Sequence, residues 1–235
     1  MHTRHDVKEK SNRENIHISY ENRVEEYHRL LATLVSEYTP SGGAILDFGC
    51  GMGTLLNIIH THNKKYTLHG ADIDPRCLQE TKKHVPNAEL FLVDQNNFDI
   101  SLFDIYYDTC VMSHILEHML SPYSELMKIM SIIKPGGHLI LAVPNPSRPE
   151  VIIGNIFKRH YANIGHAYAW DRSHWINFLE NVARLNVVQY SVDEVRCFPA
   201  RIGRTRILRG IELAIAKVLP WFSFSNIAVI QKDKT

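Results

Sequence analysis

The stretch AILDFGCGMGTLL, residues 44–56, decides the fold of this chain. Its first residues form an apolar run typical of a buried strand, and TLLNIIHTH, which begins at Thr54, has helical spacing. Glycines directly after a strand allow a tight turn that a ligand can touch, and the next helix presents free N–H groups to it. The stretch predicts a ligand-binding strand–turn–helix unit, with a glycine turn needed only for packing as the alternative.

The residues around these glycines distinguish between the candidate ligands. Asp47 lies two residues before Gly49, where a carboxylate would repel a pyrophosphate. A dinucleotide fingerprint requires Gly or Ala at position 54, which is Thr here, and no Lys follows the glycines as in a P-loop. S-adenosylmethionine carries an ammonium and a sulfonium but no phosphate, so the acidic residue favours this cofactor. The same features disfavour a nicotinamide-dependent oxidoreductase.

Short strands alternate with helices along the first 145 residues. The predicted strands are 44–49, 67–74, 88–94, 106–114 and 138–145, the last after the turn KPGG, and the predicted helices are 24–38, 54–62, 75–84 and 121–133. Such alternation indicates a parallel sheet wound by right-handed crossovers. Beyond Asn145 we expect a helix over 170–184 and strands at 187–197 and 225–232. The predicted fold is α/β, a doubly wound, mostly parallel, seven-stranded Rossmann-like sheet with helices on both faces.

A chain of 235 residues suits one domain with additions. We expect an N-terminal lid and helix over 1–40, a cofactor-binding core over 41–145, a substrate-covering insertion over 146–169, and a C-terminal helix and strand part over 170–235. Long loops in compact domains are usually functional, although an ordinary surface insertion is the alternative for 146–169.

The bulk composition excludes several classes of protein. The formal net charge of +1 argues against a surface built to hold nucleic acid. The polar start has no apolar segment typical of a secretory signal, and no run reaches the roughly 18 apolar residues of a membrane span. The four cysteines lack metal-finger spacing, which favours reduced thiols. We therefore expect a cytoplasmic protein.

Two aspartates at predicted strand ends are candidate ligand contacts. Asp72 follows Gly51 by 21 residues, which matches the spacing at which an acidic side chain meets ribose hydroxyls in such folds. Asp74 competes for this role but is better placed to cap the helix that begins at Pro75. Asp94 ends the third strand, where it could receive an adenine amino group. Asp72 or Asp94 could instead be a solvated turn residue.

Five ordered motifs, ILDFGCGMG, GADID, LVDQNNF, YDTCVMSHILEHM and IIKPGGHLILAVPN, resemble those of class I S-adenosylmethionine-dependent methyltransferases. They are nearest the group that contains ubiquinone-biosynthesis O-methyltransferases and many sugar and small-molecule methyltransferases. The resemblance covers residues 24–145 well and 165–185 loosely. It implies that S-adenosylmethionine is the cofactor, with its methionine moiety at Asp47, Gly49 and Gly51, its ribose and adenine at Asp72 and Asp94, and its sulfonium near Ser113. The expected cofactor-binding residues are Asp47, Gly49, Cys50, Gly51, Asp72, Ile73, Asp94, Gln95 and Ser113, and the region around Tyr20 is a candidate cover.

The segment SHILEHM permits several readings. His114, Glu117 and His118 match the inverted zinc-protease pattern H-x-x-E-H, but those proteases carry it within one helix, whereas here it begins where a strand ends. The segment also resembles ubiquinone and small-RNA 3′-terminal methyltransferases, in which E-x-x-E-H holds a divalent metal. His114 replaces the first Glu, and a His/Glu/His set would suit zinc or manganese better than magnesium. General-base use, metal binding and a structural role stay open, with no metal as the favoured expectation.

Methyl transfer requires a positioned acceptor that loses its proton, and a histidine base can take it. His166 resembles a histidine that points into the acceptor site of many of these enzymes, so the candidate catalytic residues are His114, His118 and His166. The expected function is O-methylation of a small or lipid-linked metabolite, of sugar or quinone-precursor type. The alternatives are a metal-assisted RNA-end methyltransferase and a non-catalytic S-adenosylmethionine-binding protein.

Residues 196–222 are basic and apolar together. Five arginines, at positions 196, 201, 204, 206 and 209, accompany apolar residues at helical spacing from Ile207 to Phe222. One interpretation is a helix packed on the sheet edge, with its charged residues outward. The other is a surface for a membrane, a lipid-linked acceptor or a phosphorylated sugar, with Trp221 at the interface. We expect peripheral membrane contact through 201–222 and no nucleic-acid partner.

Overall fold

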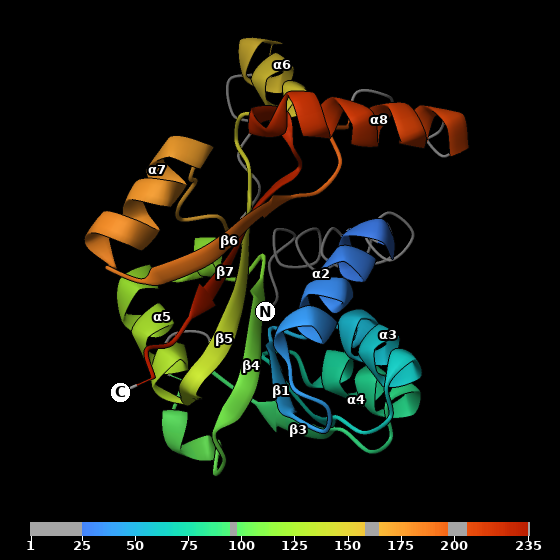
Figure 1. The fold of residues 1–235 in the computed structure, drawn as a ribbon, viewed down its shortest axis with the longest axis vertical. Coiled ribbons are helices and arrows are strands. Elements are labelled where there is room, and N and C mark those ends of the chain that lie inside the picture. The colour runs from blue at the N-terminus through green and yellow to red at the C-terminus, as the bar shows by residue number, and fades with distance from the viewer. Residues whose placement is uncertain (1–24, 95–97, 158–164, 197–205, 235) are drawn as a thin grey trace, which may run out of the picture.

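The computed structural model of the chain describes residues 25–94, 98–157, 165–196 and 206–234 (Figure 1). Tyr20, Gln95, Cys197, Arg201 and Arg204, which the sequence singles out, lie outside these residues.

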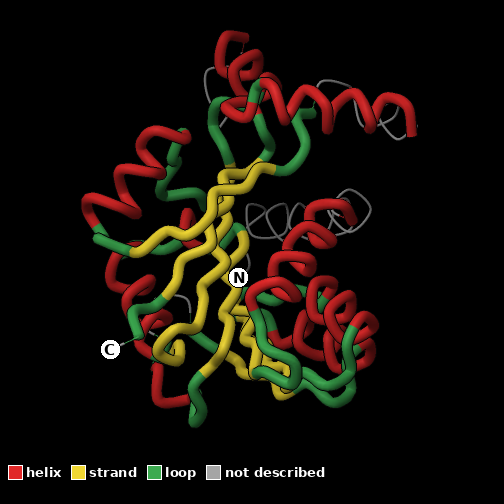
Figure 2. The backbone as a smooth tube through the Cα atoms, in the orientation of Figure 1, coloured by secondary structure: helices red, strands yellow, loops and turns green. Residues whose placement is uncertain are grey.

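One seven-stranded sheet forms the centre of the molecule (Figure 2). Its strand order is β3-β2-β1-β4-β5-β7-β6; the strands are β1 Ala44–Phe48, β2 Thr67–Asp72, β3 Glu89–Leu92, β4 Tyr107–Ser113, β5 Ile133–Pro144, β6 Asn186–Val192 and β7 Ser225–Gln231. The first five strands pair in parallel, and β7 pairs antiparallel with both β5 and β6. The predicted fold class is confirmed.

Helices cover both faces of the sheet (Figure 1). They are α2 Glu25–Tyr38, α3 Thr54–His62, α4 Pro75–His84, α5 Pro122–Ser131, α6 Pro149–Phe157, α7 Arg172–Asn177 and α8 Arg206–Val218, with short helical turns η1 Ile100–Leu102, η2 Leu116–His118, η3 Phe178–Val182 and η4 Pro220–Phe222. Figure 1 places α2, α3 and α4 on one side of the sheet and α5 and α7 on the other.

The strands are apolar on both faces because each face meets helices. In β4, Cys110 and Met112 join the cluster with α5, whereas Val111 between them joins the cluster with α2 and α3. Successive side chains of a strand point to opposite faces, so this continuous apolar run fills two cores at once. The carboxyl ends of the parallel strands therefore meet at one edge, which carries the candidate site.

Three element boundaries differ from the prediction. The residues KPGG lie inside β5 rather than before it: the register with β4 shifts between the pairs Tyr107–Ile133 and Thr109–His138, so the turn forms a bulge in the strand. The last strand but one ends at Val192 instead of 197. The helix expected over 170–184 consists of α7 and the π-helical η3.

Part of the connection expected over 146–169 is helical, because α6 occupies Pro149–Phe157. Only Val151 of this helix is buried, so its sequence lacks the one-sided apolar pattern by which buried helices are recognised. The predicted Asp74 cap is confirmed, because its side chain accepts a hydrogen bond from the Arg76 N–H. Asp171 caps α7 by accepting one from the His174 N–H.

Candidate methyl-transfer site

The glycine turn after β1 has the backbone conformation that its sequence predicts. Gly49 and Gly51 both have positive φ, 86° and 53°, which glycine adopts without steric cost. A Cβ on Gly49 would lie 2.2 Å from the Ile115 side chain, whereas a Cβ on Gly51 would meet nothing within 4 Å. Gly49 is therefore required by packing, and Gly51 leaves its backbone open to a ligand.

Asp72 at the end of β2 belongs to the same unit as the turn. Its Oδ2 accepts a hydrogen bond of 2.8 Å from the Gly51 N–H, and its Oδ1 accepts one of 2.9 Å from the Asp74 N–H. The carboxylate therefore fixes the glycine turn and the start of the β2–α4 connection together.

Asp47 lies in β1 beneath the turn and is almost completely buried. Burial, together with the smaller effect of the negative charge of Asp72, raises the pKa of this carboxyl from 3.8 to about 7. A positively charged group bound nearby would favour the ionised carboxylate and lower that pKa. Asp47 and Asp72 together make this edge suited to a cation.

The other expected cofactor contacts differ in exposure. Ile73 is 52% exposed although it is a large apolar residue, and Asp94 at the end of β3 is exposed too. Cys50 is buried, and burial raises the pKa of its thiol, which makes it a packing residue of the turn rather than a nucleophile. An exposed apolar side chain beside Asp72 is suited to a flat ligand ring.

Tyr27 of α2 is a residue that the sequence did not reveal. Its hydroxyl forms a hydrogen bond with the Ser113 hydroxyl at the carboxyl end of β4. Its ring also contacts the His114 ring edge-on, at 5.2 Å between centroids. In the sequence Tyr27 is one of several apolar positions on a helix face, and only its hydroxyl, in place of an aliphatic side chain, hints at a polar partner.

His114 follows β4 in a left-handed backbone conformation, with φ of 56°. Its Nε2 lies 3.0 Å from the Ser225 hydroxyl, and its ring stacks on Phe224. Burial, together with the smaller effect of the nearby Arg148, lowers the pKa of this imidazole to about 3. His114 is therefore neutral near neutral pH. The positive φ also interrupts any helical backbone conformation before η2. This excludes the continuous helix of an inverted zinc protease.

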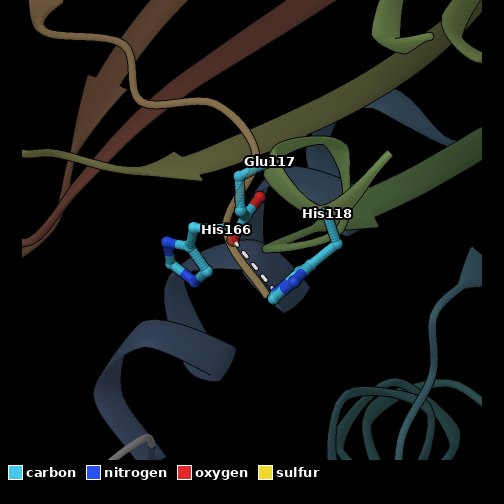
Figure 3. A group of neighbouring side chains, drawn as sticks. All are labelled: Glu117, His118 and His166. Carbon is cyan, nitrogen blue, oxygen red and sulfur yellow. Dashed lines mark ion pairs between the residues drawn. The ribbon is translucent and has the colours of Figure 1, made fainter. Parts of the chain in front are cut away.

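Glu117, His118 and His166 form a cluster in which one ligand atom of each residue lies within 4.8 Å of the others (Figure 3). Glu117 and His118 come from η2, and His166 comes from the segment before α7. The Glu117 carbonyl accepts hydrogen bonds from the N–H groups of Ala167 and Tyr168, which fixes that segment against η2. The His118 and His166 rings meet edge to face, with centroids 4.7 Å apart.

The Glu117 carboxyl is the unusual member of this cluster. It is 1% exposed, and neither of its oxygens has a hydrogen-bond partner among the described residues. Burial raises its pKa from 4.5 to about 8. The nearest groups are His114 Nδ1 at 3.7 Å and His118 Nε2 at 3.9 Å from Oε1. An ionised carboxylate that is buried without hydrogen-bond partners costs free energy. This group is therefore stabilised by taking up a proton or by binding a cation.

The two histidines of the cluster are prepared to offer lone pairs. Burial lowers the pKa of both, to about 4 for His166, so both are neutral near pH 7. His118 Nδ1 lies 3.0 Å from the Gly165 carbonyl oxygen. A proton on Nδ1 would donate to that carbonyl and leave the Nε2 lone pair facing Glu117, the orientation that a ligand or base requires.

A family model described as a methyltransferase domain matches residues 19–185. The chain belongs to this methyltransferase domain family. A ubiquinone biosynthesis O-methyltransferase of Coxiella burnetii is 28% identical over 121 residues, which cover 49% of each chain. The small RNA 2′-O-methyltransferase of Arabidopsis thaliana is 26% identical over 178 residues, covering 65% of this chain and 18% of that protein.

A similar fold occurs in the plantazolicin methyltransferase BpumL in complex with a monoazolic desmethylPZN analog and SAH, with a TM-score of 0.63 and 18% identity over 98% of this chain and 91% of that chain. The predicted class, a class I S-adenosylmethionine-dependent methyltransferase domain, is confirmed. The chain spans about half or less of the length of these curated relatives.

The methyltransferase domain therefore brings two groups of residues to its carboxyl edge. The first, around Asp47, the glycine turn and Asp72, is suited to a cationic cofactor. The second, Glu117, His118 and His166, has the donor set of a divalent-cation site, and the orphaned Glu117 carboxylate supports that fit. The sequence suggested His114 as the third ligand, whereas the structure groups His166 there and directs His114 Nε2 to Ser225.

Two arginines lie beside Phe224, and the sequence did not indicate them as residues of the candidate site. The guanidinium of Arg196 lies 3.7 Å, and that of Arg148 lies 4.5 Å, from the centre of the Phe224 ring. Phe224 also stacks on His114, and the two cations add to the effect of burial in lowering the pKa of that histidine. They come from segments after β5 and β6, so only the sheet topology brings them together.

Proposed function

We propose that this methyltransferase domain transfers the methyl group of S-adenosylmethionine to an oxygen of a small or lipid-linked metabolite. The observation that carries the proposal is the bond between the Asp72 carboxylate and the Gly51 N–H, which joins the glycine turn and the acidic strand end in one cofactor site. Asp47 beneath it supplies a negative charge for the ammonium group, and no pyrophosphate would be stable there.

The remaining contacts follow from the shape of this edge. The ribose hydroxyls would bond Asp72, the adenine would cover the exposed Ile73 side chain near Asp94, and the sulfonium would lie near Ser113. Tyr27 holds the Ser113 hydroxyl, so α2 takes part in orienting this end of the site.

Methyl transfer is an in-line displacement. A lone pair of the acceptor oxygen forms the bond to the methyl carbon while the carbon–sulfur bond breaks, and its electron pair stays on sulfur to give S-adenosylhomocysteine. The acceptor hydroxyl loses its proton to a neutral imidazole, for which His118 and His166 are better candidates than His114, because Ser225 already occupies His114 Nε2. Positioning and proton transfer both lower the barrier.

A divalent cation would be held by Glu117, His118 and His166. Such an ion, when bound, would lower the pKa of an acceptor hydroxyl. Elemental analysis of protein purified without chelator tests for it: a stoichiometric metal that Glu117→Ala removes would support this role, and a metal-free protein with full activity would assign the cluster to general-base chemistry.

The acceptor class rests on chemistry rather than on a relative. We propose a small or lipid-linked acceptor, with membrane contact through residues 201–222, because basic and apolar residues occur together there. The test is transfer of labelled methyl from S-adenosylmethionine to lipid extract, small-molecule extract and RNA. Label in RNA alone would favour the RNA-end alternative. Cofactor binding without transfer to any acceptor would favour a non-catalytic protein.

A further inference from the structure

Helix α8 turns an apolar stripe away from the molecule. Glu212 and Ala216 lie on its buried side and are 4% and 3% exposed. Ile207, Ile211 and Val218 lie on the opposite side of the helix, with 78%, 42% and 77% of their surfaces exposed. The expectation that the charged residues of this helix point outward is wrong for Glu212, which is buried, and several aliphatic side chains are outside instead.

Helix α6 adds a second exposed apolar surface at the same end of the molecule (Figure 1). Its exposed side chains are Ile152, Ile153, Ile156 and Phe157, the last 82% exposed. Asn145, just before α6, donates from its side chain to the carbonyls of Trp221 and Ser223, just after α8. The segment that leads into α6 and the segment that follows α8 are therefore hydrogen-bonded to each other at the carboxyl end of β5.

The sequence next to both helices is strongly basic. Between Glu150 and Asp171 the chain has Lys158 and Arg159 and no acidic residue, and between Glu194 and Glu212 it has five arginines and no acidic residue. Because the whole chain carries a formal charge of only +1, the rest of it is net negative. Positive charge is thus concentrated in the segments adjoining the two apolar helices.

We propose that α6, α8 and η4 form a surface that binds the interface of an anionic lipid bilayer. Exposed aliphatic side chains with adjoining arginines are the combination that such an interface selects, and Trp221, 57% exposed, suits its headgroup region. A second copy of the chain would cover the same apolar stripe but would bring the basic segments of two molecules together, which like charges oppose.

This surface adjoins the candidate site. Ser225 and Phe224, which follow η4, hold the His114 ring, and Ser225 pairs with Pro144 at the end of β5. Resting on the proposed function, the inference deepens it: the acceptor is carried by the membrane and reaches the cofactor edge from the lipid side.

The test is co-sedimentation of the full chain with phosphatidylcholine vesicles that contain or lack phosphatidylglycerol. Binding is expected only with the anionic lipid, and high salt should weaken it. The double variant Ile207→Ser/Val218→Ser should lose roughly tenfold or more of its vesicle affinity, because the side chains that would enter the bilayer are gone. The matched control is Tyr106→Ser, which removes an exposed apolar residue just before β4, at the opposite edge of the sheet.

Titration with S-adenosylmethionine accompanies each sample. Unchanged cofactor affinity in the double variant shows that it folds. Absence of wild-type binding to anionic vesicles, or equal binding by the double variant, would overturn the inference and the proposed membrane contact, while leaving the proposed methyl transfer intact. A wild-type dimer that the double variant converts to monomer would assign the surface to a second copy. Vesicle binding without cofactor binding would instead contradict the proposed function alone.

Discussion

Asp72 shows at the scale of one residue how the site is built. Its two carboxylate oxygens hold the Gly51 and Asp74 N–H groups, so a single side chain fixes two loops. Its role as a strand-end acid could be predicted from spacing, because parallel strands end at a common edge. The grouping of Glu117 with His118 could be predicted from their spacing, but that with His166 could not, because His166 lies far away in the sequence and only the fold brings it to them.

Asp72→Ala should weaken S-adenosylmethionine binding about tenfold or more, since it removes both the bonds that fix the turn and the expected ribose contact. Isothermal calorimetry measures the affinity. Asp74→Ala is the matched control: it removes the α4 cap at a cost of about 1 kcal/mol of stability but leaves the turn in place, so affinity should stay within about twofold. Equal losses in the two variants would contradict the assignment.

Glu117 predicts a dependence of stability on pH. Burial raises its pKa from 4.5 to about 8. Between these two pH values the folded state therefore holds a proton that the unfolded state has lost. Its contribution is fully present below pH 4.5 and is lost as the pH rises through about 8. Glu117→Gln cannot ionise, so with chelator present the wild type should lose about 1–3 kcal/mol more than the variant over this interval.

Urea unfolding at a series of pH values measures this difference. Glu80→Gln, which changes an exposed carboxyl that pairs with Lys83, is the control and should follow the wild-type curve. Parallel curves for the wild type and Glu117→Gln would show that the carboxyl is not protonated in the folded protein.

At the scale of elements, a local sequence pattern predicted the helices and strands that have a regular apolar periodicity and a clear terminus. Helix α4 begins at Pro75 with its aspartate cap, as expected. Helix α6 was missed because most of its apolar residues face outward, and the KPGG bulge was missed because a β-bulge depends on the neighbouring strand. A helix is recognised in a sequence by the apolar face that packs on the core. A helix whose apolar residues face outward is not recognised in this way.

The glycine turn allows packing and ligand approach to be separated. Gly49→Ala should destabilise the fold, because its Cβ would lie 2.2 Å from the Ile115 side chain in addition to the strain of positive φ. Gly51→Ala carries only the strain, about 1–2 kcal/mol, but puts a methyl group where the cofactor would approach. Gly51→Ala should therefore fold cooperatively and bind S-adenosylmethionine weakly. Thermal unfolding with calorimetry compares the two, and normal cofactor affinity in Gly51→Ala would place the ligand elsewhere.

At the scale of the whole molecule, strand and helix alternation was enough to predict the sheet and its wound topology. The antiparallel place of β7 between β5 and β6 brings Ser225 and Phe224 to His114, a contact that no local pattern contains. Among the described residues no helix is long and apolar enough to cross a membrane. The exposed helices α6 and α8 are thus a surface feature, joined to the site through β5 and β7.

The most direct test of the account is calorimetric titration of the purified protein with S-adenosylmethionine and with NAD, after its metal content has been determined. The glycine turn, Asp47 and Asp72 predict saturable binding of S-adenosylmethionine and none of NAD. Tight binding of NAD would contradict the charge argument at Asp47. The central claim would also fail if a folded sample, shown to be free of co-purified cofactor, did not bind S-adenosylmethionine.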